Sequence, residues 1–128
     1  MSSSQFGSSP SFRFQSYPVP TELPAMRAGE LDGRYLDCTP ALSPVGDTFA
    51  AIPTITIRRI DGTTVTSDDL ASAGSSWPDT IDATNRIPTY GFVAGIETAT
   101  YLLRMAGTTA QGRTFVRDWR MSVLPELG

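Results

Sequence analysis

Apolar and polar residues alternate along several short stretches of this chain, with the period of two that a β-strand requires. The clearest stretch is residues 54–60, in which Ile55 and Ile57 alternate with Thr56 and Arg58. Such alternation places every second side chain on the same face of a sheet. We therefore predict a strand here with one buried face.

The dipeptide Asp61-Gly62 separates this strand from residues 63–66, which are rich in β-branched side chains. Both central residues of a two-residue hairpin turn must tolerate positive φ, and Asp-Gly is a preferred pair for that turn. We expect a β-hairpin here. We also expect a bulge near Arg59, where the alternation breaks.

The C-terminal part of the chain predicts three further strands, at residues 90–93, 98–106 and 113–124, with a turn at residues 107–112. In the last two strands the apolar residues recur at every second position. The residues expected to face the core are Tyr101, Leu103, Met105, Phe115, Trp119, Met121 and Val123, with Arg117 interrupting the series.

Residues 31–38 predict an earlier strand, with Tyr35 and Leu31 facing inward and Cys38 acting as a small buried hydrophobe. The segments between the strands are less regular. We expect a loop at 39–47, a short strand at 49–52, a long connection at 67–78 with one helical turn at 68–73 capped by Ser67, and an ambiguous strand at 81–87.

Breakers are frequent in this chain, with 10 prolines and 11 glycines, and no stretch has a sustained helical period. About seven short strands separated by turns are typical of a β-sandwich. We therefore predict an all-β domain over residues 26–128. Residues 1–25 are rich in Ser and Pro and predict an extended N-terminal arm.

The arm contains three aromatic residues, Phe12, Phe14 and Tyr17. A frayed terminus is the usual fate of such a segment. Aromatic side chains are nevertheless costly to leave in water and are typical anchors of interfaces. These three residues are our predicted interface residues in the arm.

Charge and composition argue against several functional classes. The formal net charge is −3 and all ten basic residues are Arg, so no basic surface for nucleic acid is expected. His is absent, which removes the usual general base of a catalytic triad. The single cysteine allows no intrachain disulfide, and no apolar run has the length of a membrane span. We predict no enzyme activity, no cofactor, no nucleic-acid partner and no membrane partner.

The sequence contains residues of two other candidate sites. The carboxylates of Asp68, Asp69, Asp79 and Asp82 are candidate calcium ligands, but their spacing does not match the EF-hand loop, so we predict no metal site. Trp77 precedes a proline in the long connection and is a predicted interface residue. It is a candidate sugar platform if it is exposed and coplanar with Tyr90 or Phe92, and otherwise a cap on the open end of the sandwich.

Residues 90–124 resemble the last strands of small bacteriophage virion proteins with an immunoglobulin-like fold. In those proteins a glycine turn leads to a strand that bears a tyrosine, then to a Thr-rich Gly-Arg turn and a final strand that ends in valine. The matching residues here are Gly95, Tyr101, Thr108, Thr109, Gly112, Arg113 and Val123. Residues 54–65 fit the same plan, and the resemblance extends over residues 30–124.

The resemblance implies an immunoglobulin-like antiparallel β-sandwich without catalytic residues. It implies a virion structural protein of the neck or tail, made in the cytoplasm of a bacterial host. The expected role is an adaptor that links the neck or tail to fibres or to neighbouring tail proteins. Its partners would be neck, portal-proximal adaptor, tail or fibre proteins in a symmetric multi-copy assembly. A capsid decoration protein and a carbohydrate-binding module are the alternatives.

Overall fold

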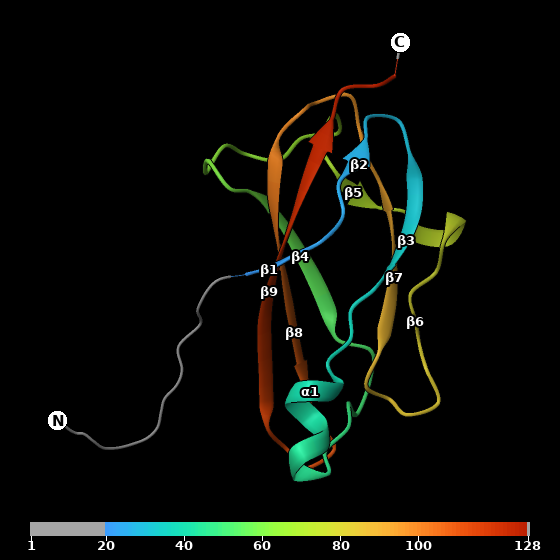
Figure 1. The fold of residues 1–128 in the computed structure, drawn as a ribbon, viewed down its shortest axis with the longest axis vertical. Coiled ribbons are helices and arrows are strands. Elements are labelled where there is room, and N and C mark those ends of the chain that lie inside the picture. Colours follow the sequence, from blue (N-terminus) through green and yellow to red (C-terminus); the bar gives the residue numbers. More distant parts are fainter. Residues whose placement is uncertain (1–19, 128) are drawn as a thin grey trace, which may run out of the picture.

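The computed structural model describes residues 20–127, which form two β-sheets packed against each other (Figure 1). The first sheet has the order β1 (Thr21–Glu22), β9 (Thr114–Leu124), β8 (Thr100–Thr108), β4 (Thr54–Arg59), and β2 (Met26–Arg27) also pairs with β9. The second sheet has the order β3 (Leu31–Tyr35), β7 (Pro88–Val93), β5 (Ala71–Ser72), and β6 (Thr80–Ile81) also pairs with β7. The predicted mostly-β composition is confirmed.

The antiparallel pair β8–β9 is the longest ladder, running from Thr100↔Ser122 to Thr108↔Thr114. Strand β4 pairs with the other edge of β8. The predicted inward residues of these strands are confirmed: Tyr101, Leu103, Met105, Trp119, Met121 and Val123 are buried and Phe115 is half-buried. Burying one such side chain contributes about 1.5–3 kcal/mol relative to leaving it in water.

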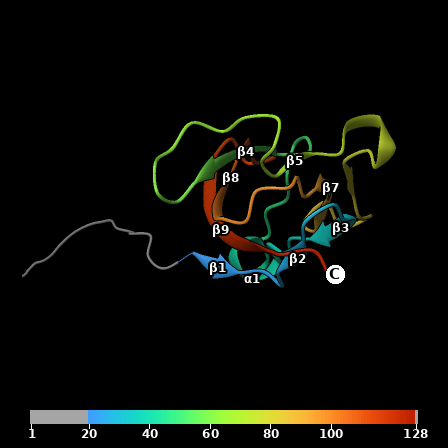
Figure 2. The same cartoon turned by 90° about the horizontal axis from the view of Figure 1, so that it is seen from above.

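The core lies between the two sheets (Figure 2). Strand β7 contributes Tyr90 and Phe92, which are buried. Cys38 lies 3.7 Å from the sulfur of Met105, across the space between the sheets. The buried position predicted for Cys38 is confirmed.

The N-terminal segment runs parallel to β9, with Thr21 paired to Trp119 and Met26 paired to Val123. These two pairs are parallel, whereas the prediction was of an antiparallel fold throughout. Leu23 is buried in the core, so residues 20–25 of the predicted arm pack against the domain. The rest of the predicted arm, including Phe12, Phe14 and Tyr17, lies outside the described residues.

Arg34 fixes this segment to the second sheet. Its guanidinium donates to the carbonyl oxygens of Pro24 at 3.3 Å and Ala25 at 3.5 Å. The same side chain pairs with Asp32. The N-terminal segment therefore contacts both sheets, through β9 on one side and Arg34 on the other.

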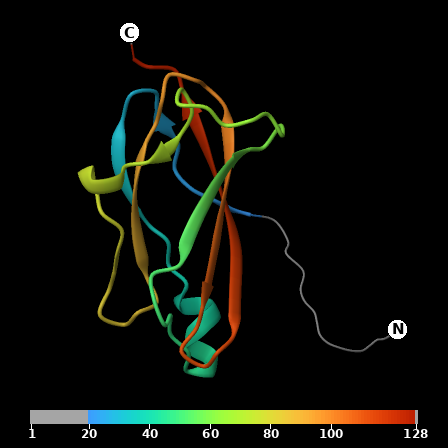
Figure 3. The same ribbon diagram turned by 180° about the vertical axis from the view of Figure 1, so that it is seen from behind.

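The predicted hairpin at Asp61-Gly62 is wrong. Strand β4 pairs with β8, and residues 63–66 form no strand. Gly62 does adopt a positive φ of 85°, so the dipeptide makes a turn. However, the backbone N–H of Thr66 donates to Asp69 at 2.8 Å, and the chain crosses to β5 in the other sheet (Figure 3).

The inward positions predicted for Leu31 and Tyr35 are also wrong. Their side chains are 44% and 77% exposed, respectively, while Leu36 and Cys38 are buried. A shift of one residue exchanges the two faces of a strand. Residues 31–38 carry apolar side chains at both odd and even positions, and the pair Leu36 and Cys38 faces the core.

The connections differ from prediction in four places. The expected loop at 39–47 contains the helix α1 (Thr39–Leu42) and a 3₁₀ turn, Ser43–Val45. The helix begins here because Asp37 accepts a hydrogen bond from the N–H of Thr39, and because Pro40 suits a first helical turn. The expected strand at 49–52 is one bridge, Phe49↔Thr109. The expected helical turn at 68–73 is absent, and β5 lies there instead. The expected strand at 81–87 is a turn at 83–86, which follows β6.

The structure predicts that the Cys38 thiol is inert in the folded protein. Burial raises the pKa of this thiol to about 12, so almost no thiolate exists at pH 8. We expect a disulfide reagent to label Cys38 only after unfolding, whereas a Thr56→Cys variant should react at its exposed site at once. Fast labelling of folded wild-type protein would contradict the buried position.

Candidate functional site

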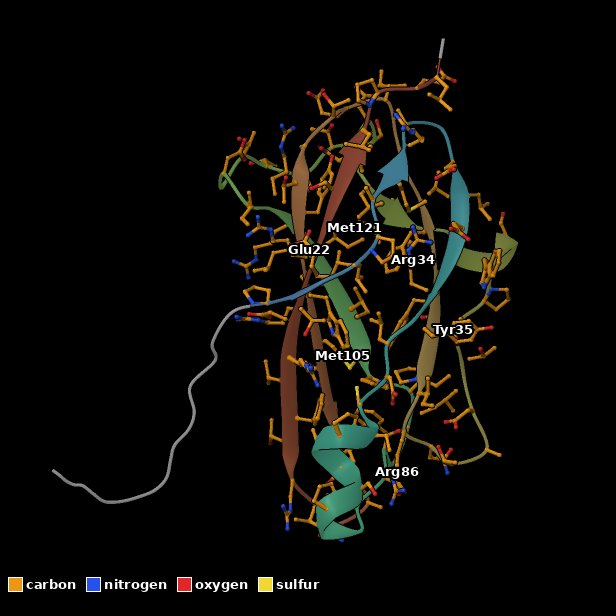
Figure 4. The ribbon with its side chains drawn as sticks, viewed as in Figure 1. Glu22, Arg34, Tyr35, Arg86, Met105 and Met121 are labelled. Carbon is orange, nitrogen blue, oxygen red and sulfur yellow. The ribbon has the colours of Figure 1, made fainter. Side chains whose placement is uncertain are left out.

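The most exposed apolar residues of the second sheet lie on its outer face, the one turned away from the core. Leu31 pairs with Val93, and Tyr35 pairs with Thr89. Leu31 and Tyr35 project outward from β3 because Leu36 takes the inward direction. Figure 4 shows Tyr35 on the outer side of β3 and Arg34 directed toward the N-terminal segment. We call this surface, formed by Leu31, Tyr35, Trp77 and Val93, the outer face.

Trp77 lies over a pair of glycines at the centre of the outer face. Gly33 of β3 is directly opposite Gly91 of β7. A Cβ atom at Gly33 would lie 2.8 Å from Nε1 of Trp77, and one at Gly91 would lie 2.8 Å from its carbonyl oxygen. Only glycine at both positions lets the indole rest on the bare backbone.

The turn before Trp77 sets its position. The N–H of Ala73 donates to the carbonyl of Gly91 at 2.9 Å, and the 3₁₀ turn Gly74–Ser76 follows. The N–H of Trp77 then donates to the carbonyl of Gly74 at 3.2 Å. The side chain is 38% exposed. Trp77 therefore does not cap the open end of the fold, as one prediction had it, but covers the middle of a sheet.

The sugar platform predicted from Trp77 with Tyr90 or Phe92 does not form. Tyr90 and Phe92 are 2% and 1% exposed, and the hydroxyl of Tyr90 donates to the carbonyl of Pro53 at 2.5 Å. The aromatic residue that shares the outer face with Trp77 is Tyr35. Sequence reasoning missed it because it placed Tyr35 on the opposite face of β3.

A buried carboxylate, Asp69, joins the two sheets at one end of the fold. It accepts hydrogen bonds from the hydroxyl of Tyr101 at 2.6 Å and the N–H of Thr66 at 2.8 Å. Arg59 also donates to it at 3.2 Å. The bond from Tyr101, followed by that from Thr66, lowers the pKa of Asp69. Because its donors Tyr101, Thr66 and Arg59 all belong to this chain, we assign Asp69 a structural role.

The four aspartates weighed as calcium ligands are not brought together. Asp82 accepts hydrogen bonds within its own loop, from the hydroxyl of Thr84 at 2.5 Å and the N–H of Ile87 at 3.0 Å. The bond from Thr84 is the main reason that the pKa of Asp82 falls to about 2. Asp69 is committed to Tyr101. Within residues 20–127 no group of three or more His, Cys, Asp or Glu side chains has a metal-binding arrangement.

The comparisons with known proteins add no relative. No family model, no curated protein and no solved structure matches this chain. In the described part of the chain no helix has the length and apolar character needed to cross a membrane. The outer face is the candidate site because Leu31, Tyr35 and Trp77 are exposed together on it.

The glycine pair gives a first test of this surface. Gly33→Ala should destabilise the protein by about 1–3 kcal/mol, because the new methyl group overlaps Trp77. In a Trp77→Ala background the same change should cost much less, since the obstacle is gone. Denaturant unfolding of the four proteins of this cycle measures the coupling. Equal costs in both backgrounds would show that Trp77 does not lie over Gly33.

The Asp69 bond gives a second test, through pH. Because the pKa of Asp69 is lowered in the folded state, its stabilising contribution is present above the ordinary carboxylate value of about 4 and is lost as pH falls through the folded value. Tyr101→Phe should cost about 1–3 kcal/mol at pH 7. That cost should shrink as pH falls below 4.

Tyr90→Phe is the matched control for this pH dependence. The hydroxyl of Tyr90 donates to a backbone carbonyl, which does not titrate. Its loss should therefore cost the same free energy of unfolding at pH 7 and at pH 3. If the two variants show the same pH profile, the Tyr101–Asp69 bond is not the origin of the effect.

Proposed function

We propose that this protein is a non-enzymatic structural protein of a bacteriophage virion, an adaptor that links the neck or tail to fibres or to neighbouring tail proteins. The observation that carries the proposal is the outer face, on which Leu31, Tyr35 and Trp77 remain exposed. Clustered exposed apolar residues are typical of binding surfaces. The resemblance of residues 90–124 to phage virion proteins supports the same role.

The strand order supports an immunoglobulin-like fold for this adaptor. In a constant-type immunoglobulin domain one sheet has the strand order A-B-E-D, and the other contains C, F and G. Here β3-β7-β5 corresponds to B-E-D, and β4-β8-β9 corresponds to C-F-G. Met105 of β8 lies 3.7 Å from Cys38, just beyond β3, where an antibody domain has its disulfide between the sheets.

The chemistry of the outer face fits a protein partner within a repeated assembly. Trp77 is held by its turn and by the glycine pair, so little conformational entropy is lost when it is covered. Other virion proteins, present in several copies around a symmetry axis, would supply the partner surfaces. Contacts that are weak singly gain from such multivalency.

The first test is capture from a lysate of phage-infected cells, using the tagged full chain and mass spectrometry. We expect portal, neck, tail or fibre proteins to be recovered by the wild-type protein. A double variant, Leu31→Ser with Tyr35→Ser, should lose them while remaining folded. Val116→Ser is the matched control, because Val116 is 38% exposed on the outer side of the other sheet.

The other outcomes of this experiment distinguish the alternatives. Recovery of major capsid protein would assign a decoration role in place of the adaptor role. Recovery of no virion protein would overturn both. Trp77 and Tyr35 share one face, which leaves a sugar-binding surface as the second candidate. A shift of Trp77 fluorescence on addition of polysaccharide, absent in Tyr35→Ser, would support it.

Removal of the arm tests its part in assembly. Deletion of residues 2–19 should leave the fold intact and abolish incorporation into particles. Deletion of residues 2–24 is a poorer test, because it also removes β1 and the buried Leu23. Loss of a buried Leu side chain costs about 2–5 kcal/mol. Normal incorporation of the protein that lacks residues 2–19 would refute an assembly role for the arm.

A further inference from the structure

Strand β4 stands at one edge of the first sheet and pairs with β8 on one side (Figure 3). Within residues 20–127 no strand pairs with its other side, which we call the open edge. The strand has six residues without a proline or a lysine, and its register with β8 is unbroken. Proteins protect exposed edges with proline, lysine, bulges or very short strands. The edge strand β5 of the second sheet has only two residues, whereas β4 has none of these protections.

Two hydrogen bonds establish which backbone groups point to the open edge. The N–H of Ile60 donates to a carbonyl of β8 at 3.0 Å. Backbone groups of successive residues point in opposite directions, so the even-numbered residues face β8 and the odd-numbered residues face the open edge. The carbonyl of Arg59 accepts from the N–H of Gly62 at 3.0 Å, which occupies one end of this edge. Within the described chain, no hydrogen bond engages the outward N–H and carbonyl groups of Ile55 and Ile57.

The core-facing side chains of β4 are incompletely covered at this edge. Ile55 and Ile57 are only half-buried and pack at the margin of the core. Their partners on β8, Met105 and Leu103, are completely buried. A strand added to the open edge would place its own side chains against Ile55 and Ile57. The addition would therefore satisfy the outward backbone groups and extend the core at the same time.

We propose that the open edge of β4 binds β4 of a second copy of this chain in antiparallel orientation, which joins the two first sheets into one continuous sheet. A contact between identical strands about a twofold axis is antiparallel and self-complementary. The register that places Ile55 opposite Ile57 of the second copy uses all four outward groups in four hydrogen bonds. The twofold axis then places Thr56 opposite itself.

The side chains of β4 match one another in this register. Ile55 meets Ile57 on the core side of the sheet, and Thr56 meets Thr56 on the solvent side. Cross-strand pairs of β-branched side chains and of threonines stabilise a sheet. Arg58 is exposed and lies opposite Thr54 of the second copy, so no like charges meet.

Neighbouring registers use the backbone less well. Sliding the second copy by two residues in one direction would bring Ile57 opposite Pro53, which has no N–H to donate. Sliding it by two residues in the other direction would bring Ile55 opposite Arg59, whose carbonyl already accepts a hydrogen bond within the turn. The register with Thr56 on the axis is therefore preferred.

Two exposed isoleucines at the ends of β4 favour a second copy as the occupant. Ile52 lies just before the strand and Ile60 just after it, and both are exposed. The same register brings Ile60 of each copy next to Ile52 of the other. Two apolar side chains that a single copy leaves in water would thereby cover each other at both ends of the contact. An unrelated strand would not supply this match.

Sedimentation equilibrium of the purified full chain tests the self-association separately from the proposed virion role. We expect the mean mass to rise with concentration from 13.8 kDa toward twice that value. The double variant Leu31→Ser with Tyr35→Ser should associate equally, because the outer face belongs to the other sheet. A chain that stays monomeric up to about 1 mM would overturn the proposal. Loss of association in the double variant would also overturn it, by placing the contact on the outer face.

Charged variants test the register. Thr54→Glu would place a carboxylate opposite Arg58 of the second copy at both ends of the contact and should tighten the dimer about two- to thirtyfold. Thr56→Glu would place two carboxylates opposite each other on the axis and should weaken the dimer. The two variants are matched, because they add the same charge to the same exposed side of β4. The reverse ranking would overturn this register.

Introduced cysteines test the position of the axis. Thr56→Cys would place two thiols opposite each other in a non-hydrogen-bonded pair with Cα atoms about 4.5 Å apart, within reach of a disulfide. Brief oxidation by diamide, which takes up the two electrons and two protons of the thiol pair, should convert this variant into a covalent dimer. Thr54→Cys is the matched control, because its two copies would lie about 13 Å apart and should remain unlinked. Equal linking of the two variants would overturn the proposal.

Discussion

The parallel attachment of the N-terminal segment to β9 is the constraint on which the arrangement of the rest depends. Strand β9 is the longest in the described chain, with 11 residues, and it takes β8 on one edge and both β1 and β2 on the other. This places Leu23 and Met26 in the core and brings the carbonyls of Pro24 and Ala25 within reach of Arg34. One short segment thereby joins the last strand of the first sheet to β3 of the second.

A second connection between the two sheets is the segment that runs from β4 to β5. After β4 the chain turns at Gly62 and is captured by Asp69, which bonds Thr66, Tyr101 and Arg59. A buried carboxylate is costly unless its oxygens are satisfied, and here both oxygens accept hydrogen bonds. The network selects a crossing to β5 over a local hairpin. Strand β5 then pairs with β7, the strand in which Gly91 lies opposite Gly33 of β3.

The sequence predicted correctly those strands whose large buried side chains follow a single alternating pattern. Tyr101, Leu103 and Met105 stand at alternate positions with the charged Arg104 on the opposite face, and their strand was placed correctly. Residues 31–38 carry two competing patterns, and local reasoning chose Leu31 and Tyr35 where the core takes Leu36 and Cys38. The hairpin expected at Asp61-Gly62 does not form, because Asp69 accepts a hydrogen bond from Thr66 in the chain that follows. The residues of the turn alone do not reveal this contact. The position of Trp77 depends on a pairing across strands, although glycine within a strand is itself an indication of close approach by another group.

The register of β3 also determines which side chains lie on the outer face. The inward turn of Leu36 is what leaves Tyr35 exposed beside Trp77, so the stability of the core and the aromatic character of the outer face follow from the same choice of register. A substitution that favours the other register would hide Tyr35 and expose Leu36 together. Exchanging the side chains on the two faces of β3 would require β3 to unpair from β7. An aromatic side chain that is held in place loses little entropy on binding, which is consistent with the docking role proposed for this face.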